Sequence, residues 1–357
     1  MDRQRGIHLS RVQTLTVEEG DGDQRLDRWF KRVFPQIPQG RIEKMCRKGE
    51  IRVDGGRVKG STRIEVGQQI RIPPLPTGEA PPPPKRTTVT EAETRMIRAC
   101  VIYRDDHVIA LNKPPGLPVQ GGSGQGERHV DALAEALMFD LEEKPRLVHR
   151  LDKDTSGVLV LARTREAAKA LTANFRHRET RKIYWAVVAG VPHPRDGTIK
   201  FGLVKAGGHG ARGEGEKMHA VHPRDVDETE GAKRATTDYT VLEQVGTRAA
   251  WMALSPVTGR THQLRVHMAE IGHPIVGDGK YGGSGQENMG DGWGAQLGGD
   301  ISKKLHLHAR SLTIQHPATK AMLNLVAPIP EHMQRTWDTF AWQTKFAPAD
   351  PFGDDWG

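Results

Sequence analysis

The sequence predicts an α+β protein in which a small, basic α/β domain precedes a larger domain built on a mixed sheet. In the larger part, segments with strand and helix periodicity follow one another without strict alternation. A proline-rich stretch separates the two parts, and the excess of basic residues lies in the first part. These three observations together indicate a polyanion-binding module joined to a catalytic body.

Length and composition limit the possible classes of protein. The chain has 357 residues, which suits two or three domains. It contains no apolar run near the roughly 20 residues of a membrane helix, and residues 1–13 contain no signal-like apolar block. The two cysteines, Cys46 and Cys100, are too few for a disulfide framework. We therefore expect a cytoplasmic protein with no membrane association.

The basic residues are concentrated in a short segment. Residues 24–72 contain thirteen Lys and Arg against five Asp and Glu, an excess that equals the net charge of +8 of the whole chain. Two short helices are expected within residues 25–49, and strand material within residues 51–72. A solvated helix face would also explain the charge, but its density favours binding to nucleic acid.

The remaining boundaries follow from composition. Residues 1–23 have little apolar periodicity and are expected to be a flexible arm. The prolines of residues 73–95 predict an extended linker. The main domain spans residues 96–330, and residues 331–357 form a C-terminal helix and tail. Residues 202–235 and 282–303, rich in Gly and charge, are expected to be loops.

The elements of the main domain follow from hydrophobic periodicity. The continuous apolar run 158–162 predicts a strand buried on both faces. Thr164 is expected to cap the helix 164–178, and Thr261 the helix 261–271. A third helix is expected over residues 129–142. Further strands are expected at residues 101–103, 108–112, 182–189, 237–243, 250–255 and 312–315.

One candidate site is the stretch His149–Gly157, which leads into the buried strand. Asp152 would be held there by a rigid element and kept ionised by the neighbouring cations Arg150 and Lys153. From local sequence alone, a salt-bridged turn at a strand edge explains the same pattern.

Two further stretches contain candidate residues. In residues 258–267, Arg265 lies beside the apolar stripe of a helix and needs a carboxylate partner if buried. In residues 181–186, Lys182 and Tyr184 share one strand face, and the Tyr could stack on a base. The alternatives are a surface helix with ordinary charges and a core tyrosine. The histidines, including His306 and His308, do not form a persuasive metal motif, so we expect no metal site.

The three stretches together resemble the RNA pseudouridine synthases of the large-subunit (23S) ribosomal RNA kind that begin with an S4 domain. The matching motifs include His149-Arg150-Leu151-Asp152, Lys182-x-Tyr184-x-Ala186 and Thr258–Arg265. The match continues through Asn112–Leu117, Gly272–Asp278 and Leu307–Ala309, while Arg41–Ile72 is similar to an S4 domain. The resemblance implies a largely antiparallel central sheet with flanking helices and loops.

The resemblance also implies roles for individual residues. Asp152 is the essential carboxylate, Tyr184 stacks on a flipped uracil, and Arg265 forms a salt bridge that keeps Asp152 ionised. Arg150 fills the gap left by the extruded nucleotide. Whether Asp152 attacks the ribose or the base, or forms a glycal intermediate, stays open. The other residues expected to bind substrate are His149, Lys182, Thr155, Gln263 and Arg260; those expected to contact RNA elsewhere are Arg41, Lys44, Arg47, Lys48 and Arg52.

The expected activity is isomerisation of chosen uridines in 23S rRNA to pseudouridine by a monomer, on precursor RNA or the assembling large subunit. No cofactor is expected, because neither a redox step nor a group transfer to another molecule occurs. The alternatives are another structured RNA as substrate, a non-catalytic RNA-binding assembly factor, and a hydrolase with an Asp nucleophile.

Overall fold

The computed structural model describes residues 10–76, 89–121, 128–177, 179–205, 217–282 and 301–353. The chain divides into an N-terminal unit, Met1–Thr88, and a C-terminal unit, Val89–Gly357. Among the described residues, no helix combines the length and the apolar character that a membrane span requires.

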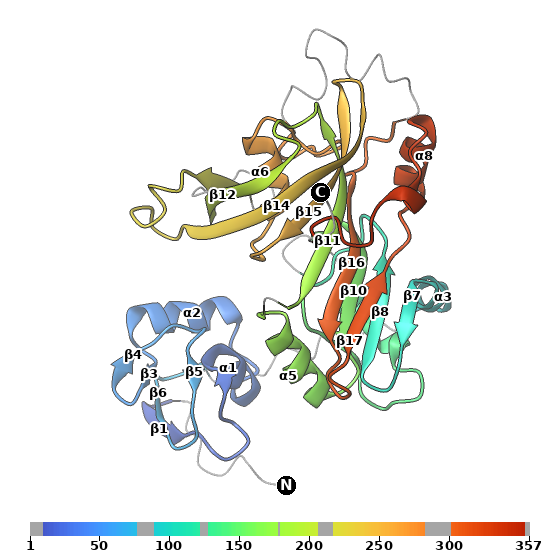
Figure 1. The fold of residues 1–357 in the computed structure, drawn as a ribbon. Coiled ribbons are helices and arrows are strands. Elements are labelled where there is room, and N and C mark those ends of the chain that lie inside the picture. The colour runs from blue at the N-terminus through green and yellow to red at the C-terminus, as the bar shows by residue number, and fades with distance from the viewer. Residues whose placement is uncertain are drawn as a thin grey trace. The chain divides into compact units, whose positions relative to one another are not determined.

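The N-terminal unit combines two helices with short antiparallel strands (Figure 1). Buried side chains of both helices, among them Phe30 and Ile42, form one apolar core with strand residues such as Ile70. Its sheet has the order β1-β6-β3-β4, while β2 pairs with β5. The elements are β1 (Gln13–Thr16), β2 (Gln24–Arg25), α1 (Leu26–Val33), α2 (Gln39–Lys48), β3 (Arg52–Val53), β4 (Gly56–Arg57), β5 (Arg63–Ile64) and β6 (Gln69–Ile72).

Two predicted boundaries of this region are wrong. The arm predicted over residues 1–23 contains β1, which pairs with β6, and Val17, which is buried in the core. The linker predicted over residues 73–95 is shorter than expected, because both of its ends belong to folded parts of the chain. Leu75 packs into the N-terminal core, and a capping box of Thr90 and Glu93 starts helix α3 (Glu91–Ala99). The prolines of residues 81–84 lie outside the described residues.

The C-terminal unit is built on one sheet of eleven strands, in which β10 and β16 form the single parallel pair found among the described residues. The prediction of a mixed, largely antiparallel sheet is confirmed. The order is β13-β12-β14-β15-β11-β16-β10-β8-β7, with β17 paired to β16 and β9 to β10. The strands are β7 (Val101–Arg104), β8 (Val108–Lys113), β9 (Arg146–Leu147), β10 (Ser156–Ala162), β11 (Arg181–Ala189), β12 (Asp196–Lys205), β13 (Met218–Val221), β14 (Lys233–Val245), β15 (Ala249–Pro256), β16 (Leu307–Gln315) and β17 (Met322–Val326).

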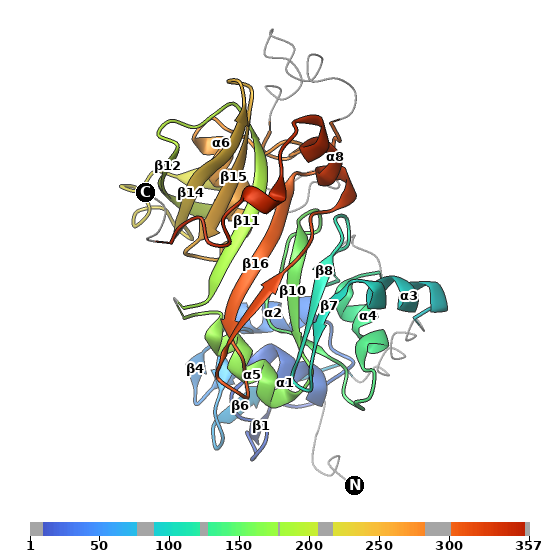
Figure 2. The ribbon, with the colours of Figure 1, turned by 45° about the vertical axis from the view of Figure 1, so that its right-hand side comes forward.

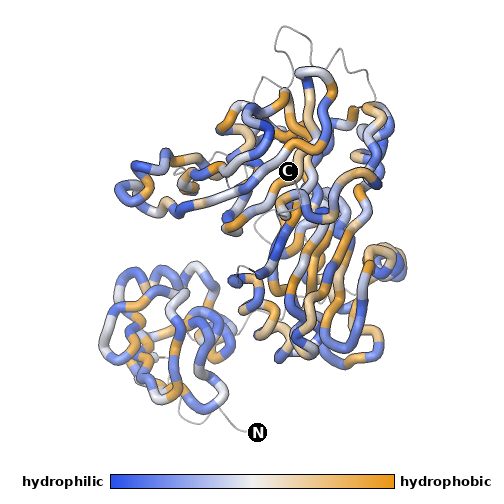
Figure 3. The backbone as a smooth tube through the Cα atoms, viewed as in Figure 1, coloured by the Kyte–Doolittle hydropathy of each residue, from blue (hydrophilic) through white to orange (hydrophobic). Residues whose placement is uncertain are grey.

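Helices cover both faces of this sheet (Figure 2). In β10, Leu159 and Leu161 pack with α3 and α4 (Val130–Leu133), whereas Val158 and Val160 pack on the opposite side with α5 (Arg165–Asn174). Coverage of both faces explains the continuous apolar run of β10. Figure 3 shows apolar residues along these central strands.

The strand β11 has the same two-sided packing. Ala186 and Val188 point to the face of the sheet that α6 (Gln263–Glu270) covers, and Trp185 points to the face that α8 (Glu331–Thr339) covers. Because side chains alternate along a strand, Tyr184 lies on the face of Ala186, towards α6.

Several predicted elements are shorter than expected or differ. The helix predicted over residues 129–142 is the short α4 followed by a 3-10 turn (Ala134–Leu137), and Phe139 has a φ of 52°. The helix capped by Thr164 is confirmed. The loop predicted at 202–235 instead contains parts of β12 and β14 and all of β13, while its residues 206–216, like residues 283–300 of the second predicted loop, lie outside the described residues.

Candidate active site

The loop that carries Asp152 is held in place by buried polar contacts. Lys113, fully buried, donates hydrogen bonds from Nζ to the carbonyl oxygens of Pro114, Leu117 and Lys153, each at 2.9 Å. The backbone N–H of Gly116 donates to the same Lys153 oxygen. Burial lowers the pKa of Lys113 to about 7, although the charges of nearby carboxylates oppose the shift. The loop is therefore a fixed support for Asp152.

The far side of this loop is anchored to β10 and α5. The Nε2 atom of His149 accepts a hydrogen bond from the backbone N–H of Val160 at 2.8 Å, and its ring lies 4.3 Å from that of Phe175. Burial, with a contribution from the charge of Lys182, lowers the pKa of His149 to about 3. His149 is thus a neutral side chain that anchors the loop through Nε2.

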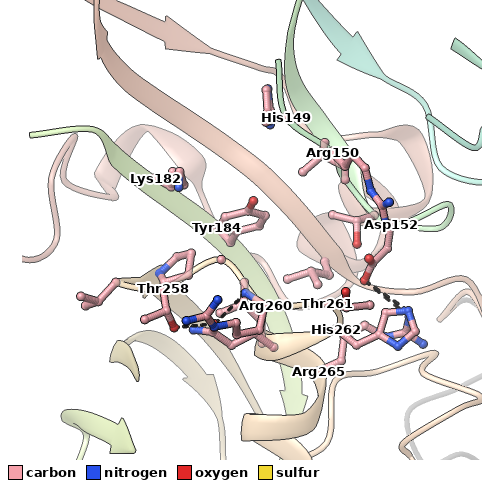
Figure 4. A pocket seen from close by; sticks show the side chains of 18 of the residues that line it. His149, Arg150, Asp152, Lys182, Tyr184, Thr258, Arg260, Thr261, His262 and Arg265 are labelled. Atoms are coloured by element: carbon pink, nitrogen blue, oxygen red, sulfur yellow. Dashed lines mark hydrogen bonds and ion pairs between the residues drawn. The ribbon is translucent and has the colours of Figure 1, made fainter. Parts of the chain in front are cut away.

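A cavity of about 640 Å³ opens beside Asp152. The Asp152 loop, the end of α5, the start of β11 and the turn before α6 supply its walls. Figure 4 shows Asp152 on one side, the Tyr184 ring in the middle and Arg260 opposite. The volume lies in the ordinary range of ligand pockets, about 300–1,000 Å³.

Two side chains face the same carboxylate oxygen of Asp152, which is 25% exposed. Arg265 Nη1 lies 3.7 Å from Oδ2, and His262 Nε2 lies 3.9 Å from it. Both separations exceed hydrogen-bond length, so the contacts are electrostatic in this state. The predicted ion pair between Arg265 and Asp152 is therefore present, but it is loose.

The closer partner of Arg265 is Asp278. Nε and Nη2 of Arg265 donate to the two carboxylate oxygens of Asp278 at 2.8 and 2.7 Å. Both side chains are buried, with 7% and 1% of their surfaces exposed. Burial by itself would lower the pKa of Arg265. The hydrogen bonds and the charge of Asp278 outweigh this effect, so the pKa lies above its ordinary value. Arg265 therefore stays charged, with Nη1 directed at Asp152.

Tyr184 stands between Asp152 and Lys182 (Figure 4). Burial raises its pKa above the ordinary value of a tyrosine, and the charge of Asp152 adds to the shift. The hydroxyl is consequently protonated at neutral pH. Lys182 Nζ lies 5.4 Å from the centre of the Phe175 ring, a cation–π contact, and burial lowers its pKa.

The turn before α6 differs from the predicted cap. His262, not Thr261, is the N-cap residue, and its φ of 52° lies in the left-handed region. Gln263 is buried, and its Oε1 accepts hydrogen bonds from Thr258 and the backbone of Arg260. Its Nε2 donates to the Thr236 carbonyl and the Thr237 hydroxyl. Gln263 lines the cavity, and its polar atoms hold the turn that presents Arg260; its contact with substrate stays a prediction.

The other predicted residues divide into exposed and buried groups. Arg150 and Arg260 line the cavity with exposed side chains. Thr155 also lines it but is buried, and its backbone N–H donates to the Asp152 carbonyl. In the N-terminal unit, Arg52 donates to backbone carbonyls of Gly49 and Gly55 and so braces the β3–β4 turn. The cations exposed on α2 are Arg41, Lys44, Arg47 and Lys48.

Two of the histidines weighed as metal ligands, the closely spaced pair His306 and His308, have internal partners. His306 contacts the Lys304 carbonyl and the Thr336 hydroxyl, while His308 contacts the Ser156 hydroxyl and the Ala327 carbonyl. Among the described residues, no cluster of three or more His, Cys, Asp or Glu side chains has the arrangement of a metal site.

Local sequence patterns did not identify the residues that surround Arg265. Asp278 fell within a matched motif but received no role, because nothing local relates it to a residue thirteen positions earlier. Tyr281 was missed for the same reason, and His262 was considered only as one of the possible metal ligands. The signal that the sequence offered for this pair was Asp278, an acidic residue that directly follows Gly277 and could pair with the buried Arg265.

Comparisons with known proteins agree with this geometry. Residues 107–270 match the family model described as RNA pseudouridylate synthase, and residues 24–70 match the S4 domain. The chain is 34% identical to ribosomal large subunit pseudouridine synthase C of Vibrio cholerae, over 91% of this chain and 96% of that protein. It is also 34% identical to the mitochondrial RNA pseudouridine synthase 4 of Arabidopsis thaliana, over 87% of this chain and 78% of that one. The solved structure of human RNA pseudouridylate synthase domain containing 4 matches with 30% identity and a TM-score of 0.55, over 70% of this chain and 96% of that chain.

Proposed function

The chain belongs to the RNA pseudouridylate synthase family, and we propose that its substrates are selected uridines of large-subunit (23S) ribosomal RNA. The Vibrio cholerae relative is named for the large ribosomal subunit and aligns with nearly its full length. The observation that supports catalysis at Asp152 is its place on a braced loop beside a cavity, facing a buried arginine. Preorganised charge of this kind is what electrostatic catalysis requires.

In the proposed reaction, the bond between C1′ and N1 of uridine breaks and a bond between C1′ and C5 forms. N1 gains a proton, and C5 loses one, so the product is an isomer. We assign Asp152 the carboxylate role in this exchange, as nucleophile or base. Tyr184 is assigned the role of stacking on the uracil, because its ring lines the cavity between Asp152 and Lys182 (Figure 4). Removing the nucleotide from its stack costs a few kcal/mol, which contacts with Arg150 and Arg260 would offset.

The RNA outside the cavity would contact the exposed cations of α2. Arg41, Lys44, Arg47 and Lys48 are exposed along one helix of the S4 match. Contacts with phosphates position an RNA without specifying its sequence. We further propose that the enzyme acts as a monomer in the cytoplasm, on precursor RNA or the assembling large subunit.

The test replaces Asp152 by Asn in cells that lack the natural gene, with pseudouridine mapped across the large-subunit RNA. We expect specific pseudouridines to disappear with the gene, to return with the wild-type chain, and to stay absent with Asp152→Asn. Asp154→Asn is the matched control, because Asp154 is an exposed carboxylate of the same loop; it should restore them. Pseudouridines that persist without the gene would exclude this RNA as substrate, and their return with Asp152→Asn would exclude the assigned role.

The non-catalytic alternative makes a different prediction from the same strains. An assembly factor would support normal ribosome formation with Asp152→Asn, and would fail when the four α2 cations are changed to Gln. The proposed enzyme should retain its site specificity in the α2 variant but bind RNA more weakly, with a shallower dependence on salt.

A further inference from the structure

Two residues with no assigned role, Tyr281 and His262, are joined by a hydrogen bond, and the far nitrogen of His262 faces Asp152 at 3.9 Å. We propose that Tyr281 fixes His262 in the tautomer whose Nε2–H faces the carboxylate, so that both act as positioning residues for Asp152. This proposal rests on the assignment of Asp152 as the reacting carboxylate.

The direction of this hydrogen bond follows from the donors around it. The backbone N–H of Met218 donates to the hydroxyl oxygen of Tyr281 at 2.9 Å. The same hydroxyl lies 2.7 Å from Nδ1 of His262. A backbone amide can only donate, so the Tyr281 oxygen accepts from it. The hydroxyl keeps its own proton, and in the proposed arrangement that proton is donated to Nδ1, 2.7 Å away. Nδ1 is then the acceptor, and a neutral His262 carries its proton on Nε2.

The surroundings of His262 keep it neutral. Its side chain is 12% exposed. Burial lowers its pKa; Asp152 and Asp278 oppose this shift, while Arg265 and Lys280 reinforce it. The neutral imidazole presents one N–H, and the hydrogen bond described above directs that N–H to Asp152.

The backbone conformation of His262 indicates that the surrounding structure holds this residue in place. Its φ of 52° is uncommon for a residue other than Gly, Asn or Asp, and such strain persists only where the surroundings impose it. The Nε2 atom lies 3.9 Å from Oδ2 of Asp152. Catalytic hydrogen bonds are often long without substrate and shorten in the complex. A small movement of either side chain would close this one.

The arrangement distinguishes the two oxygens of Asp152. Both His262 Nε2 and Arg265 Nη1 approach Oδ2. Tyr281 supports both groups, because its ring lies 5.2 Å from the Arg265 guanidinium and its backbone N–H donates to Asp278. Oδ2 is thus the oxygen that both groups face, which leaves Oδ1 as the oxygen that reacts with substrate in this proposal.

The first measurement determines the tautomer directly. The full-length protein, labelled with nitrogen-15 in its sixteen histidines, is examined by NMR, and His262 is identified by its loss in His262→Gln. We expect Nδ1 of His262 to be unprotonated and Nε2 to be protonated in the wild type. In Tyr281→Phe, which keeps the ring beside Arg265, this preference should weaken or reverse. A protonated Nδ1 in the wild type, or an unchanged tautomer in Tyr281→Phe, overturns the proposal.

The second measurement follows catalysis by release of tritium from a 23S rRNA transcript labelled at C5 of uridine. Tyr281→Phe should lower kcat about tenfold, the value of one good hydrogen bond, with KM unchanged. His262→Gln retains an amide donor near Nε2 and should keep most of the activity. His262→Asn should fall as low as His262→Leu, although Asn tolerates the left-handed backbone better than Gln does. Equal activity of the Gln and Leu variants contradicts the proposal, because it would show that the donor is not needed.

The two readouts separate this proposal from the proposed function. A wild-type protein inactive on the transcript would refute the substrate, and an active Asp152→Asn would refute the carboxylate role. Neither result affects the NMR spectrum, which decides whether Tyr281 sets the tautomer of His262.

Discussion

The buried pair of Arg265 and Asp278 allows stability and catalysis to be separated by mutation. Asp278→Asn keeps the shape of the side chain but removes the charge that compensates Arg265. Removing one partner of a buried ion pair costs about 3–5 kcal/mol. Asp278 accepts two hydrogen bonds from Arg265 and one each from the backbone N–H groups of Lys280 and Tyr281. The amide oxygen of Asn can still accept part of this set, so we expect a loss near the lower limit, about 3 kcal/mol.

That loss corresponds to a measurable fall in melting temperature. For a unit of this size, each kcal/mol shifts Tm by about 2–4 °C, so Asp278→Asn should melt roughly 6–12 °C lower. The measurement is calorimetry of the full chain at pH 7, with the transition of the larger unit followed. Activity should also fall, because Arg265 loses the contact that directs Nη1 at Asp152.

The double variant Arg265→Met with Asp278→Leu provides the control. Replacing both partners of a buried pair by apolar residues of similar volume is often neutral or stabilising. We expect its Tm to lie above that of Asp278→Asn but below that of the wild type, because the backbone N–H groups of Lys280 and Tyr281 lose their acceptor, while activity stays absent because Arg265 no longer faces Asp152. A shift under about 2 °C in Asp278→Asn, or a double variant less stable than the single one, would refute the reasoning.

Further predictions concern the strands and the loop beside the site. Gly157→Ala should lose at least about 3 kcal/mol of stability, because its φ is +107° and a Cβ would lie 2.2 Å from the Ala309 carbonyl oxygen. Gly116→Ala, with a φ of +82° and no atom within 4 Å of its Cβ, should lose about 1–2 kcal/mol by chemical denaturation; equal losses would contradict the steric argument. Burial lowers the pKa of Lys113 from 10.5 to about 7, so the unfolded chain binds more protons than the folded one between these values, and stability rises with pH. The Tm of the wild type relative to Lys113→Met should therefore increase from pH 7 to pH 10, and a constant difference would show that Lys113 stays charged.

The parts of the fold that could be predicted depend on local periodicity. The apolar run of β10 indicated a strand buried on both faces, and its alternate residues do pack against α4 and α5. Tyr184 could be placed on a strand face because side-chain alternation is a local property. The β12–β13 hairpin was missed because its polar residues and glycines resemble a loop. The hairpin lies at the edge of the sheet, where a strand can be polar and needs no apolar pattern.

The parts of the site that could not be predicted depend on tertiary contacts. Gln263 looked available for substrate, yet Thr236 and Thr237, more than twenty residues earlier, use its amide. Gly277 has a φ of +76°, and a Cβ there would lie 2.1 Å from the Lys304 carbonyl oxygen, so its requirement comes from a distant segment. This turn also brings Asp278 to Arg265. Sequence periodicity contains no information about contacts between residues that are distant in the sequence.

The division of the Arg265 guanidinium between two carboxylates bears on how Asp152 can react. A bidentate pair with Asp152 would occupy both of its oxygens and lower its basicity, because hydrogen bonds to a charged form stabilise that form. Asp278 instead binds Nε and Nη2, which leaves Nη1 facing Oδ2 alone at 3.7 Å. The positive charge that faces Asp152 is already partly compensated by Asp278. Asp152 therefore faces a cation that is fixed in place beforehand, and Arg265 approaches only one of its two oxygens.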